Sequence, residues 1–153
     1  MSSPNIRPTY SIKEASALSG LPASTLRYYE SIGVIAPIGR GASSRHRVYT
    51  EEDLDLLTWV ACLSATGMSV GDMRRYVENG ALGPAAAPGQ IELLEAQQEQ
   101  LALEAKSIAL RRRYVGLKIE YWRAVQAGDD ARAMQLSDEA RALAEDLKKT
   151  KEQ

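Results

Sequence analysis

The sequence has little of the chemistry on which most enzymes and metal proteins depend. Among its 153 residues there are one cysteine, Cys62, one histidine, His46, and no phenylalanine. A single cysteine excludes an internal disulfide and any zinc site built from several cysteines. No Ser/His/Asp set, no paired carboxylates and no phosphate-binding loop can be recognised, so an enzyme has little support. We predict no metal and no cofactor.

Long apolar runs are also missing. No stretch approaches the roughly 20 consecutive apolar residues that a membrane-spanning helix needs. The first ten residues, MSSPNIRPTY, lack the apolar segment of a signal peptide. We therefore expect a cytoplasmic protein with no membrane partner.

The charge is unevenly distributed along the chain, although its net value is only −1. Residues 1–50 contain six Lys and Arg side chains against two acidic ones, which gives +4. Residues 51–153 contain 13 basic and 18 acidic side chains, which gives −5. A basic first third on an acidic remainder predicts a local face that binds a polyanion such as nucleic acid.

Two short helices joined by a glycine turn are predicted near the N-terminus. Ser11 and Glu14 have the spacing of a capping box, and the helix that they begin should span residues 12–19 and end at Gly20. The stretch LPASTLRYYESIG should form a second helix that ends at Gly33. Two helices joined in this way indicate a helix-turn-helix.

The chain after this motif loses its helical periodicity. VIAPIGRGASSRHRVYT favours a small two-stranded wing with a basic tip. Thr50 and Asp53 then form a second capping box before a helix that is apolar on two sides and should end at Gly67. One more short helix is expected at residues 69–78.

The longest periodic segment follows a predicted linker at residues 81–90, where glycine and proline are frequent. Over residues 91–126, large apolar residues recur at every seventh position, which is position d of a coiled-coil heptad. We predict that these residues form a dimerisation seam: Leu94, Leu101, Ile108, Val115 and Trp122. The corresponding a positions are weaker: Ile91, Gln98, Ala105, Arg112 and Ile119.

A second leucine stripe lies roughly opposite the seam, because two residues on a helix subtend about 200°. It contains Leu103, Leu110 and Leu117, and a final helix within residues 127–153 should cover it. The arginine run at 111–113 is expected to be a solvated face, with an inter-subunit ion pair to Glu99 or Glu104 as the alternative.

Three stretches stand in a recognisable order and spacing: TLRYYESIGVI, RHRVYTEEDLDLL and LSATGMSVGDMRRYV. With them, the sequence resembles the MerR family of bacterial transcription regulators. The resemblance is specific over about residues 10–78 and architectural over 91–122. Ser16 and His46 depart from the alanine and tyrosine that are usual at their positions.

The resemblance implies a mainly α fold. Its parts are a winged helix-turn-helix over residues 1–80, with a second helix pair as another wing, and a long antiparallel coiled coil that joins a homodimer. A short C-terminal helix packs on the coiled coil. The resemblance also implies binding to promoters with an overlong spacer, which such dimers untwist so that RNA polymerase can engage.

The second helix of a helix-turn-helix enters the major groove with its N-terminal residues. The candidate DNA-binding residues therefore lie on that helix and on the wing: Ser24, Thr25, Arg27, Tyr28, Arg45, His46, Arg47 and Tyr49. Arg27 can pair with a base edge or a phosphate, and Tyr28 can bond a phosphate oxygen. Leu26 and Tyr29 should face inward. The alternative is that these polar side chains only solvate a helix surface.

Metal-responsive members of the family carry cysteines at the start of the coiled coil and in the loop after it. Here those places read GPAAAPGQI and VQAGDDAR, without Cys or His. Cys62 is instead similar in position to the lone cysteine of an aldehyde- and electrophile-responsive subgroup, where that cysteine is the proposed sensor. A thiolate that adds to a carbonyl, or that an oxidant oxidises, would add bulk at this position and shift the wing helices. The alternative is a small, partly buried packing residue, and nearby Asp55 argues against reactivity.

Three functions therefore remain open. The first is a dimeric, sequence-specific transcription regulator, and the second is an effector-independent architectural or excisionase-like DNA-binding protein. The third is a coiled-coil interaction protein whose helix-turn-helix is vestigial. DNA binding that weakens steeply with salt separates the third from the others. A response to an electrophile separates the first from the second.

Overall fold

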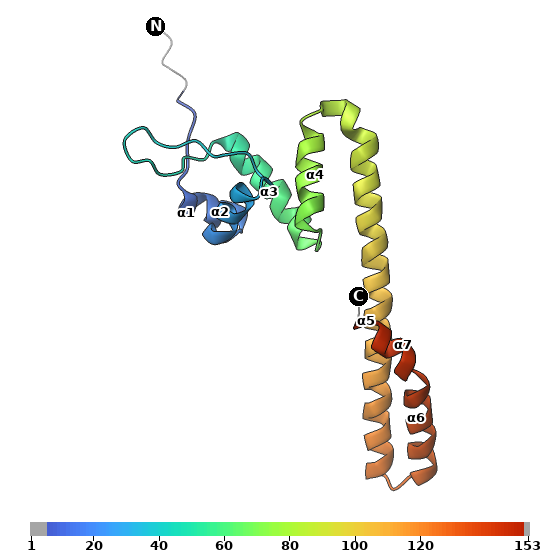
Figure 1. Cartoon of the computed structure of the whole chain (residues 1–153). Coiled ribbons are helices and arrows are strands. Elements are labelled where there is room, and N and C mark those ends of the chain that lie inside the picture. Colours follow the sequence, from blue (N-terminus) through green and yellow to red (C-terminus); the bar gives the residue numbers. More distant parts are fainter. Residues whose placement is uncertain (1–5, 152–153) are drawn as a thin grey trace. The chain divides into compact units, whose positions relative to one another are not determined.

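The computed structural model describes residues 6–151, which form helices joined by turns and one long loop (Figure 1). The elements are α1 (Ile12–Ser19), α2 (Ala23–Ser31), α3 (Glu51–Ala65), α4 (Val70–Gly80), the 3-10 turn η1 (Gly83–Ala86), α5 (Ala87–Gln126), α6 (Asp130–Ala142) and α7 (Ala144–Lys149). The mainly α prediction is confirmed. Residues 1–5, where we expect no signal peptide, and 152–153 lie outside the described residues.

The chain divides into two compact units, and the boundary falls within α5 after Leu94. Among the described helices, none combines the length and the apolar character that crossing a bilayer requires.

The first helix has its predicted bounds, and its capping box is formed. The Glu14 N–H donates to Ser11 Oγ over 3.2 Å, and the Ser11 N–H donates to Glu14 Oε1 over 3.0 Å. This second bond lowers the pKa of the Glu14 carboxyl. Gly20 ends the helix with a φ of 77°, which glycine adopts without strain. The Ser16 hydroxyl donates to the Leu21 carbonyl over 2.7 Å, so this serine ties α1 to the turn before α2.

The core of the first unit lies among α1, α2, α3 and α4. Its most buried large side chains are Leu26, Val34, Tyr49, Leu57, Val60 and Met73. Leu26 and Tyr29 of α2 face this core, which confirms their predicted direction. The Tyr29 hydroxyl also bonds Ser64 Oγ over 3.2 Å and so joins α2 to α3. Because these two side chains hold one side of α2 in the core, the opposite side of the helix faces solvent.

The wing is a loop, and the prediction of two strands is wrong. Among the described residues, extended pairing in this region is limited to two isolated antiparallel bridges, Tyr10 with Tyr49 and Arg40 with Arg47. The loop extends away from the helices of its unit (Figure 1). Proline and glycine are frequent between residues 36 and 41, and both weaken strand pairing. The two arms therefore meet at too few positions to form a ladder.

The predicted linker at residues 81–90 is largely helical. Gly83–Ala86 form the 3-10 turn, and α5 begins at Ala87 rather than at residue 91. Pro88 lies in the first turn of α5, where its missing N–H leaves no helical bond unmade. Glycine and proline thus mark a helix boundary here.

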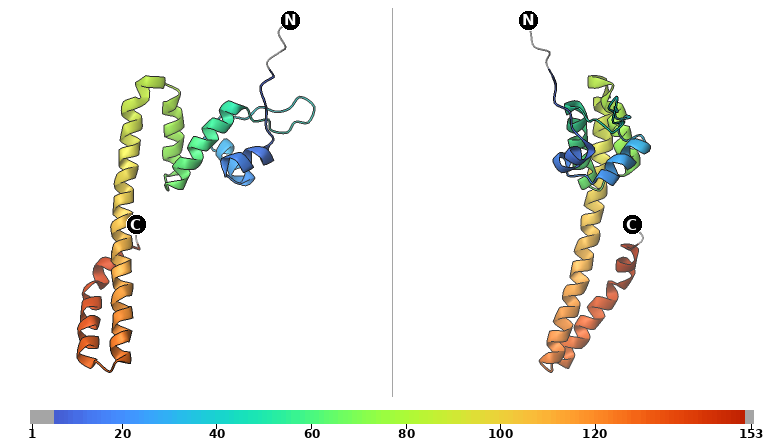
Figure 2. Two further views of the ribbon diagram at one scale, coloured as in Figure 1. Left: turned by 180° about the vertical axis from the view of Figure 1, so that it is seen from behind. Right: turned by 90° about the vertical axis from the view of Figure 1, so that its left-hand side faces the viewer.

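In the second unit, α6 runs back along the C-terminal half of α5 (Figure 2). The residues buried between these helices are mostly small: Leu117, Ala124, Ala133, Leu136 and Ala140. Leu117 of the second leucine stripe is covered as predicted, whereas Leu103 stays exposed. The predicted single C-terminal helix is two helices, because the chain breaks at Leu143 between α6 and α7.

The arginine run is not a uniform solvated face. Arg111 donates from Nε to Thr150 Oγ1 over 3.2 Å and from Nη2 to the Thr150 carbonyl over 2.8 Å. These bonds hold the end of α7 against α5, and they correct the expected role of Arg111. Arg112 and Arg113 are exposed.

Candidate nucleic-acid interface

Helix α2 presents a polar and basic side to solvent. Ser24, Arg27 and Tyr28 are exposed, and Thr25 is half-buried. The rings of Tyr28 and Tyr29 lie 6.2 Å apart between centroids, so the outer tyrosine rests beside the buried one. Three of the four predicted α2 residues are therefore open to solvent, and Thr25 is the least accessible of the four.

The tip of the wing is held in a tight turn. Arg45 has a φ of 57°, in the left-handed region that residues other than glycine seldom adopt. Its N–H donates to the Gly41 carbonyl over 3.0 Å, and its carbonyl accepts from Arg40 Nη1 over 3.2 Å. The side chains of Arg45 and His46 are exposed. A tip that is already ordered loses less entropy on binding a polyanion.

The other two predicted wing residues point inward. Arg47 donates from Nε to Glu30 Oε1 over 2.9 Å, and Tyr49 is 0% exposed. Within the described part of the chain, the Tyr49 hydroxyl has no hydrogen-bond partner, and burial raises the pKa of this phenol. The prediction that Tyr49 contacts DNA is wrong for this structure. Side chains alternate along extended backbone, so Arg47 and Tyr49 share one side and His46 takes the other.

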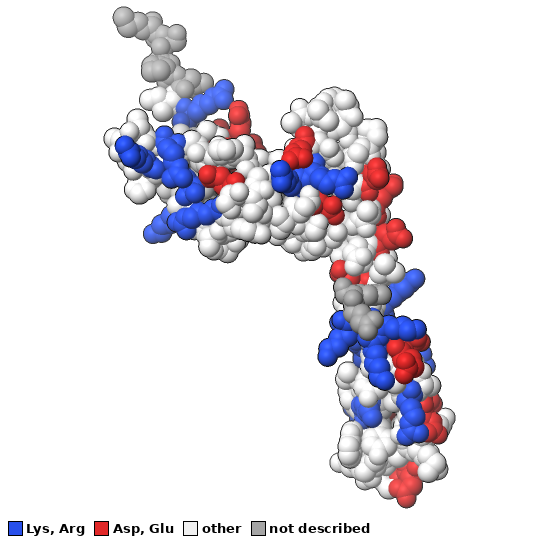
Figure 3. Space-filling view, in the orientation of Figure 1, with Lys and Arg blue, Asp and Glu red and all other residues white. Residues whose placement is uncertain are grey.

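Two basic residues near this surface, Arg40 and Arg74, are not among the residues that the sequence predicted for the site. Lys and Arg side chains gather over the wing and over the end of the unit that α1 and α2 form (Figure 3). Arg40 is exposed at the wing, and its place in a basic loop could have revealed it. Arg74 of α4 lies beside the turn after α2, with its Nε 3.6 Å from the point where a Cβ would stand if Gly33 were replaced. No local signal indicates this contact, because the two residues are far apart in the chain.

The predicted sensor residue, Cys62, is a free and exposed cysteine on α3. Its exposure contradicts the alternative of a partly buried packing residue. Within residues 6–151 there is no group of three or more His, Cys, Asp or Glu side chains placed to hold a metal ion.

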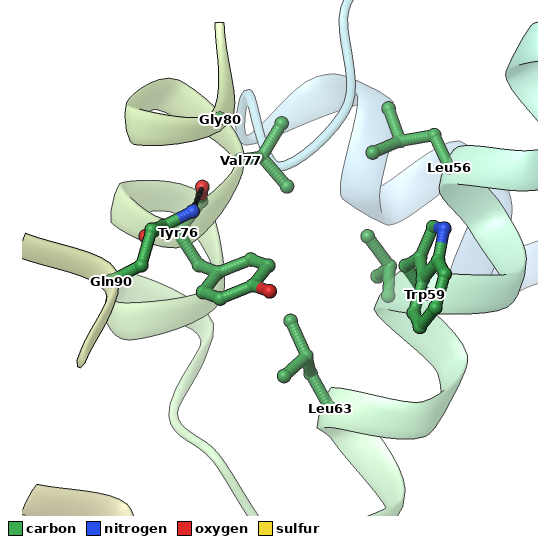
Figure 4. Close-up of a pocket in the computed structure, with 8 residues that line it drawn as sticks. Leu56, Trp59, Leu63, Tyr76, Val77, Gly80 and Gln90 are labelled. Carbon is green, nitrogen blue, oxygen red and sulfur yellow. Dashed lines mark hydrogen bonds between the residues drawn. The ribbon is translucent and has the colours of Figure 1, made fainter. Parts of the chain in front are cut away.

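An apolar cavity of about 360 Å³ lies between α3 and α4 (Figure 4). Its lining consists of Leu56, Trp59, Val60, Leu63, Tyr76, Val77, Gly80 and Gln90. The Tyr76 ring points into the cavity, while Gln90 Nε2 donates to the Tyr76 carbonyl over 2.8 Å and Gln90 Oε1 accepts from Asn79 over 3.2 Å. Gln90 thus ties the first turn of α5 to α4. The cavity offers an apolar surface and no acid–base or nucleophilic set.

Comparison with known proteins identifies the family to which this chain belongs. Residues 10–86 match the family described as MerR HTH family regulatory protein. An uncharacterized HTH-type transcriptional regulator of Haemophilus influenzae is 30% identical over 131 residues, which cover 84% of this chain and 94% of that protein. The chain belongs to the MerR family. It is therefore a DNA-binding transcription regulator and not an enzyme.

Solved structures of other MerR-family proteins are similar. One is HiNmlR, a MerR family regulator lacking the sensor domain, in a crystal structure bound to promoter DNA. It is 27% identical, with a TM-score of 0.61 and coverage of 78% of this chain and 94% of that one. Another is a MerR-family regulator of Listeria monocytogenes, also 27% identical, with a TM-score of 0.65 and coverage of 84% and 98%.

Proposed function

We propose that this MerR-family chain acts in the cytoplasm as a homodimer that binds promoter DNA through α2 and the wing. The dimer distorts the promoter spacer so that RNA polymerase can engage. The observation that supports the dimer is the exposure of the predicted seam. Its five large apolar residues are between 40% and 64% exposed along one face of α5.

A helix with such a face requires a partner. The seam contains a leucine, isoleucine, valine or tryptophan at every seventh position, and each fully buried side chain of this kind contributes about 1.5–3 kcal/mol. Helix α6 covers the opposite face of α5, through Leu117 and Ala124. The seam is therefore available to a second copy of the same helix.

The a positions indicate the direction of pairing. In a parallel pair each a residue meets its own copy, so Arg112 would meet Arg112 between the helices, and like charges repel there. In an antiparallel pair each a residue meets a d residue. Arg112 then lies beside Leu101 of the second copy, where its aliphatic stem packs and its guanidinium reaches solvent. This argument favours the antiparallel pair.

One antiparallel register places apolar residues together at both ends of the seam. It sets Ile91 against Trp122 and Leu94 against Ile119 of the second copy. All four of these side chains are exposed in the single chain. The two-fold axis then passes between Lys106 and Ser107.

A two-fold dimer presents two copies of α2 and two wings to DNA. Dimeric helix-turn-helix proteins bind two half-sites in this way, and the spacing of the half-sites follows from the dimer. A DNA spacer that does not match the dimer must bend or untwist, at a cost that the additional phosphate contacts offset. HiNmlR, which is bound to promoter DNA, supports the DNA partner.

Arg27→Ala should weaken specific DNA binding by about 1–3 kcal/mol, because an exposed arginine on a groove-entering helix pairs with a base edge or a phosphate. Fluorescence anisotropy measures this with a labelled duplex from the region upstream of the chain's own gene. A random-sequence duplex of equal length gives the selectivity. Arg7→Ala is the matched control, since Arg7 is exposed and lies next to Glu52 rather than on α2. Unchanged affinity and selectivity of Arg27→Ala would refute the assignment of α2 to the groove.

The dimer also responds to electrophiles through Cys62 in our proposal, and the exposure of this thiol supports it. The thiolate sulfur adds to the carbonyl carbon of an aldehyde, and a C–S bond forms. The π electrons of the carbonyl move to its oxygen, which then takes up a proton from water. The added group lies on the last turn of α3, the end of the helix that leads into α4.

Cys62→Ser should retain DNA binding and lose the change in transcription that an aldehyde causes. In vitro transcription with and without the aldehyde measures this, and intact-protein mass spectrometry detects the adduct. The matched control is Cys62→Ser combined with Ala65→Cys, which places the lone thiol about one turn further along α3. A response that persists in Cys62→Ser eliminates the sensor, and the effector-independent alternative predicts no response in any variant.

A further inference from the structure

An ion pair joins the two elements that face DNA in the proposed function. Glu30 lies in the last turn of α2, and Arg47 lies on the returning arm of the wing. Arg47 Nε and Glu30 Oε1 are 2.9 Å apart, and the two side chains are only 20% and 15% exposed. Exposed ion pairs contribute little to stability, whereas a charge-assisted hydrogen bond that is shielded from solvent is stronger. Removing one partner of such a shielded pair costs more, because the other charge is left without its partner.

The surroundings of this pair hold both partners in place. Arg47 itself forms a β-bridge with Arg40, and two residues later Tyr49 bridges to Tyr10. Tyr49 is fully buried, so the arm of the wing enters the core immediately after Arg47. The pair is therefore the last fixed point before the exposed tip. From there the wing depends on a few backbone bonds of its own.

We propose that Glu30 and Arg47 are positioning residues, which fix the wing relative to α2 so that both elements meet the DNA backbone together. Arg47 then holds no phosphate, although its sequence context on a basic wing predicts that it does. Exposed Arg45 at the tip is the phosphate contact. This inference rests on the proposal that α2 and the wing bind DNA.

A positioning role for Glu30 predicts a different effect on DNA affinity from the one that its charge alone predicts. Removal of a negative charge beside DNA should strengthen binding to phosphates. We expect Glu30→Gln to weaken binding by about tenfold instead, because loss of one charge-assisted bond releases the wing. Arg47→Gln should weaken binding equally. The double variant should be no weaker than either single variant, because both remove the same interaction.

Salt dependence separates positioning from contact. The logarithm of the binding constant falls as the logarithm of the salt concentration rises, and each phosphate contact makes this fall steeper by about 0.9. The slope is the size of this fall. Anisotropy titrations with the upstream duplex should therefore give Arg47→Gln and Glu30→Gln the wild-type slope. Arg45→Gln, the matched control, should lower the slope by about one. The swapped variant, Glu30→Arg with Arg47→Glu, should recover most of the lost affinity.

Hydrogen exchange in the DNA-free chain tests the pair independently. The N–H groups of Gly41, Arg45 and Val48 are bonded within the wing and should exchange faster in both single variants. A slope lowered by one in Arg47→Gln, with unchanged or tighter binding in Glu30→Gln, would show that Arg47 holds a phosphate and would overturn the inference. Unchanged exchange of the wing amides would also overturn it. If the wild-type chain bound neither duplex, the proposed function would fail, while the exchange measurement would still decide the role of the pair.

Discussion

Ile108→Glu is expected to convert the dimer into monomers. Ile108 is 52% exposed in the single chain and lies at the centre of the seam. In the proposed register it meets Ala105 of the second copy, and the two Ile108 residues of a dimer lie in neighbouring layers beside the two-fold axis. Two glutamates there would be buried close to each other. We expect the dimer dissociation constant to rise by at least about a thousandfold, which corresponds to roughly 4 kcal/mol.

Sedimentation equilibrium measures this change, since the chain has a mass of 16.7 kDa and a dimer twice that. The matched control is Gln100→Glu, which adds the same charge to α5 outside the seam, at an exposed position. Binding to the upstream duplex should fall sharply in Ile108→Glu and stay unchanged in the control, because a monomer reaches only one half-site. A variant that remained dimeric and bound DNA normally would show that the seam residues do not form the interface.

Local patterns predicted the helices well because the signals that start and stop a helix lie within it or next to it. Both capping boxes are formed as expected, and Thr50 Oγ1 accepts the Asp53 N–H over 3.1 Å. Periodicity placed Leu26 and Tyr29 in the core because helical residues only three apart lie on the same side. The inner and outer sides of α2 were thus readable from the sequence.

The prediction was weaker wherever a side chain meets a residue that is distant in the chain. Arg47 looked like a DNA contact because it lies in a basic loop, and nothing near it in sequence indicates that Glu30 binds it. Arg111 looked solvated for the same reason, since its partner Thr150 is 39 residues away. Tyr49 could have been recognised, because it directly precedes the Thr50 helix cap at the end of an extended segment, where every second side chain faces the core.

Replacing Leu26, the buried leucine of α2, should have the second large effect, a loss of stability in the first unit. Leu26 is 0% exposed, and it packs in the core that also contains Ala15 of α1 and Leu57 of α3. Leu26→Ala removes apolar contacts on all sides and leaves a cavity, at a cost of about 2–5 kcal/mol in the free energy of unfolding. Leu18→Ala is the matched control, since Leu18 is 63% exposed on α1, and it should change stability by less than about 0.5 kcal/mol.

Urea denaturation followed by circular dichroism measures both variants, and hydrogen exchange locates the loss. If Leu26 anchors α2, amides of α1 and α2 should lose protection while those of α6 keep it, because the two helix groups belong to different units. DNA affinity should then fall in parallel with the fraction of chains in which α2 is folded. Tyr29→Phe removes only the 3.2 Å bond to Ser64, and about 1 kcal/mol is expected for it. A larger effect for Tyr29→Phe than for Leu26→Ala would mean that the hydrogen bond to Ser64 of α3, rather than the burial of Leu26 in the core, holds the DNA-binding helix.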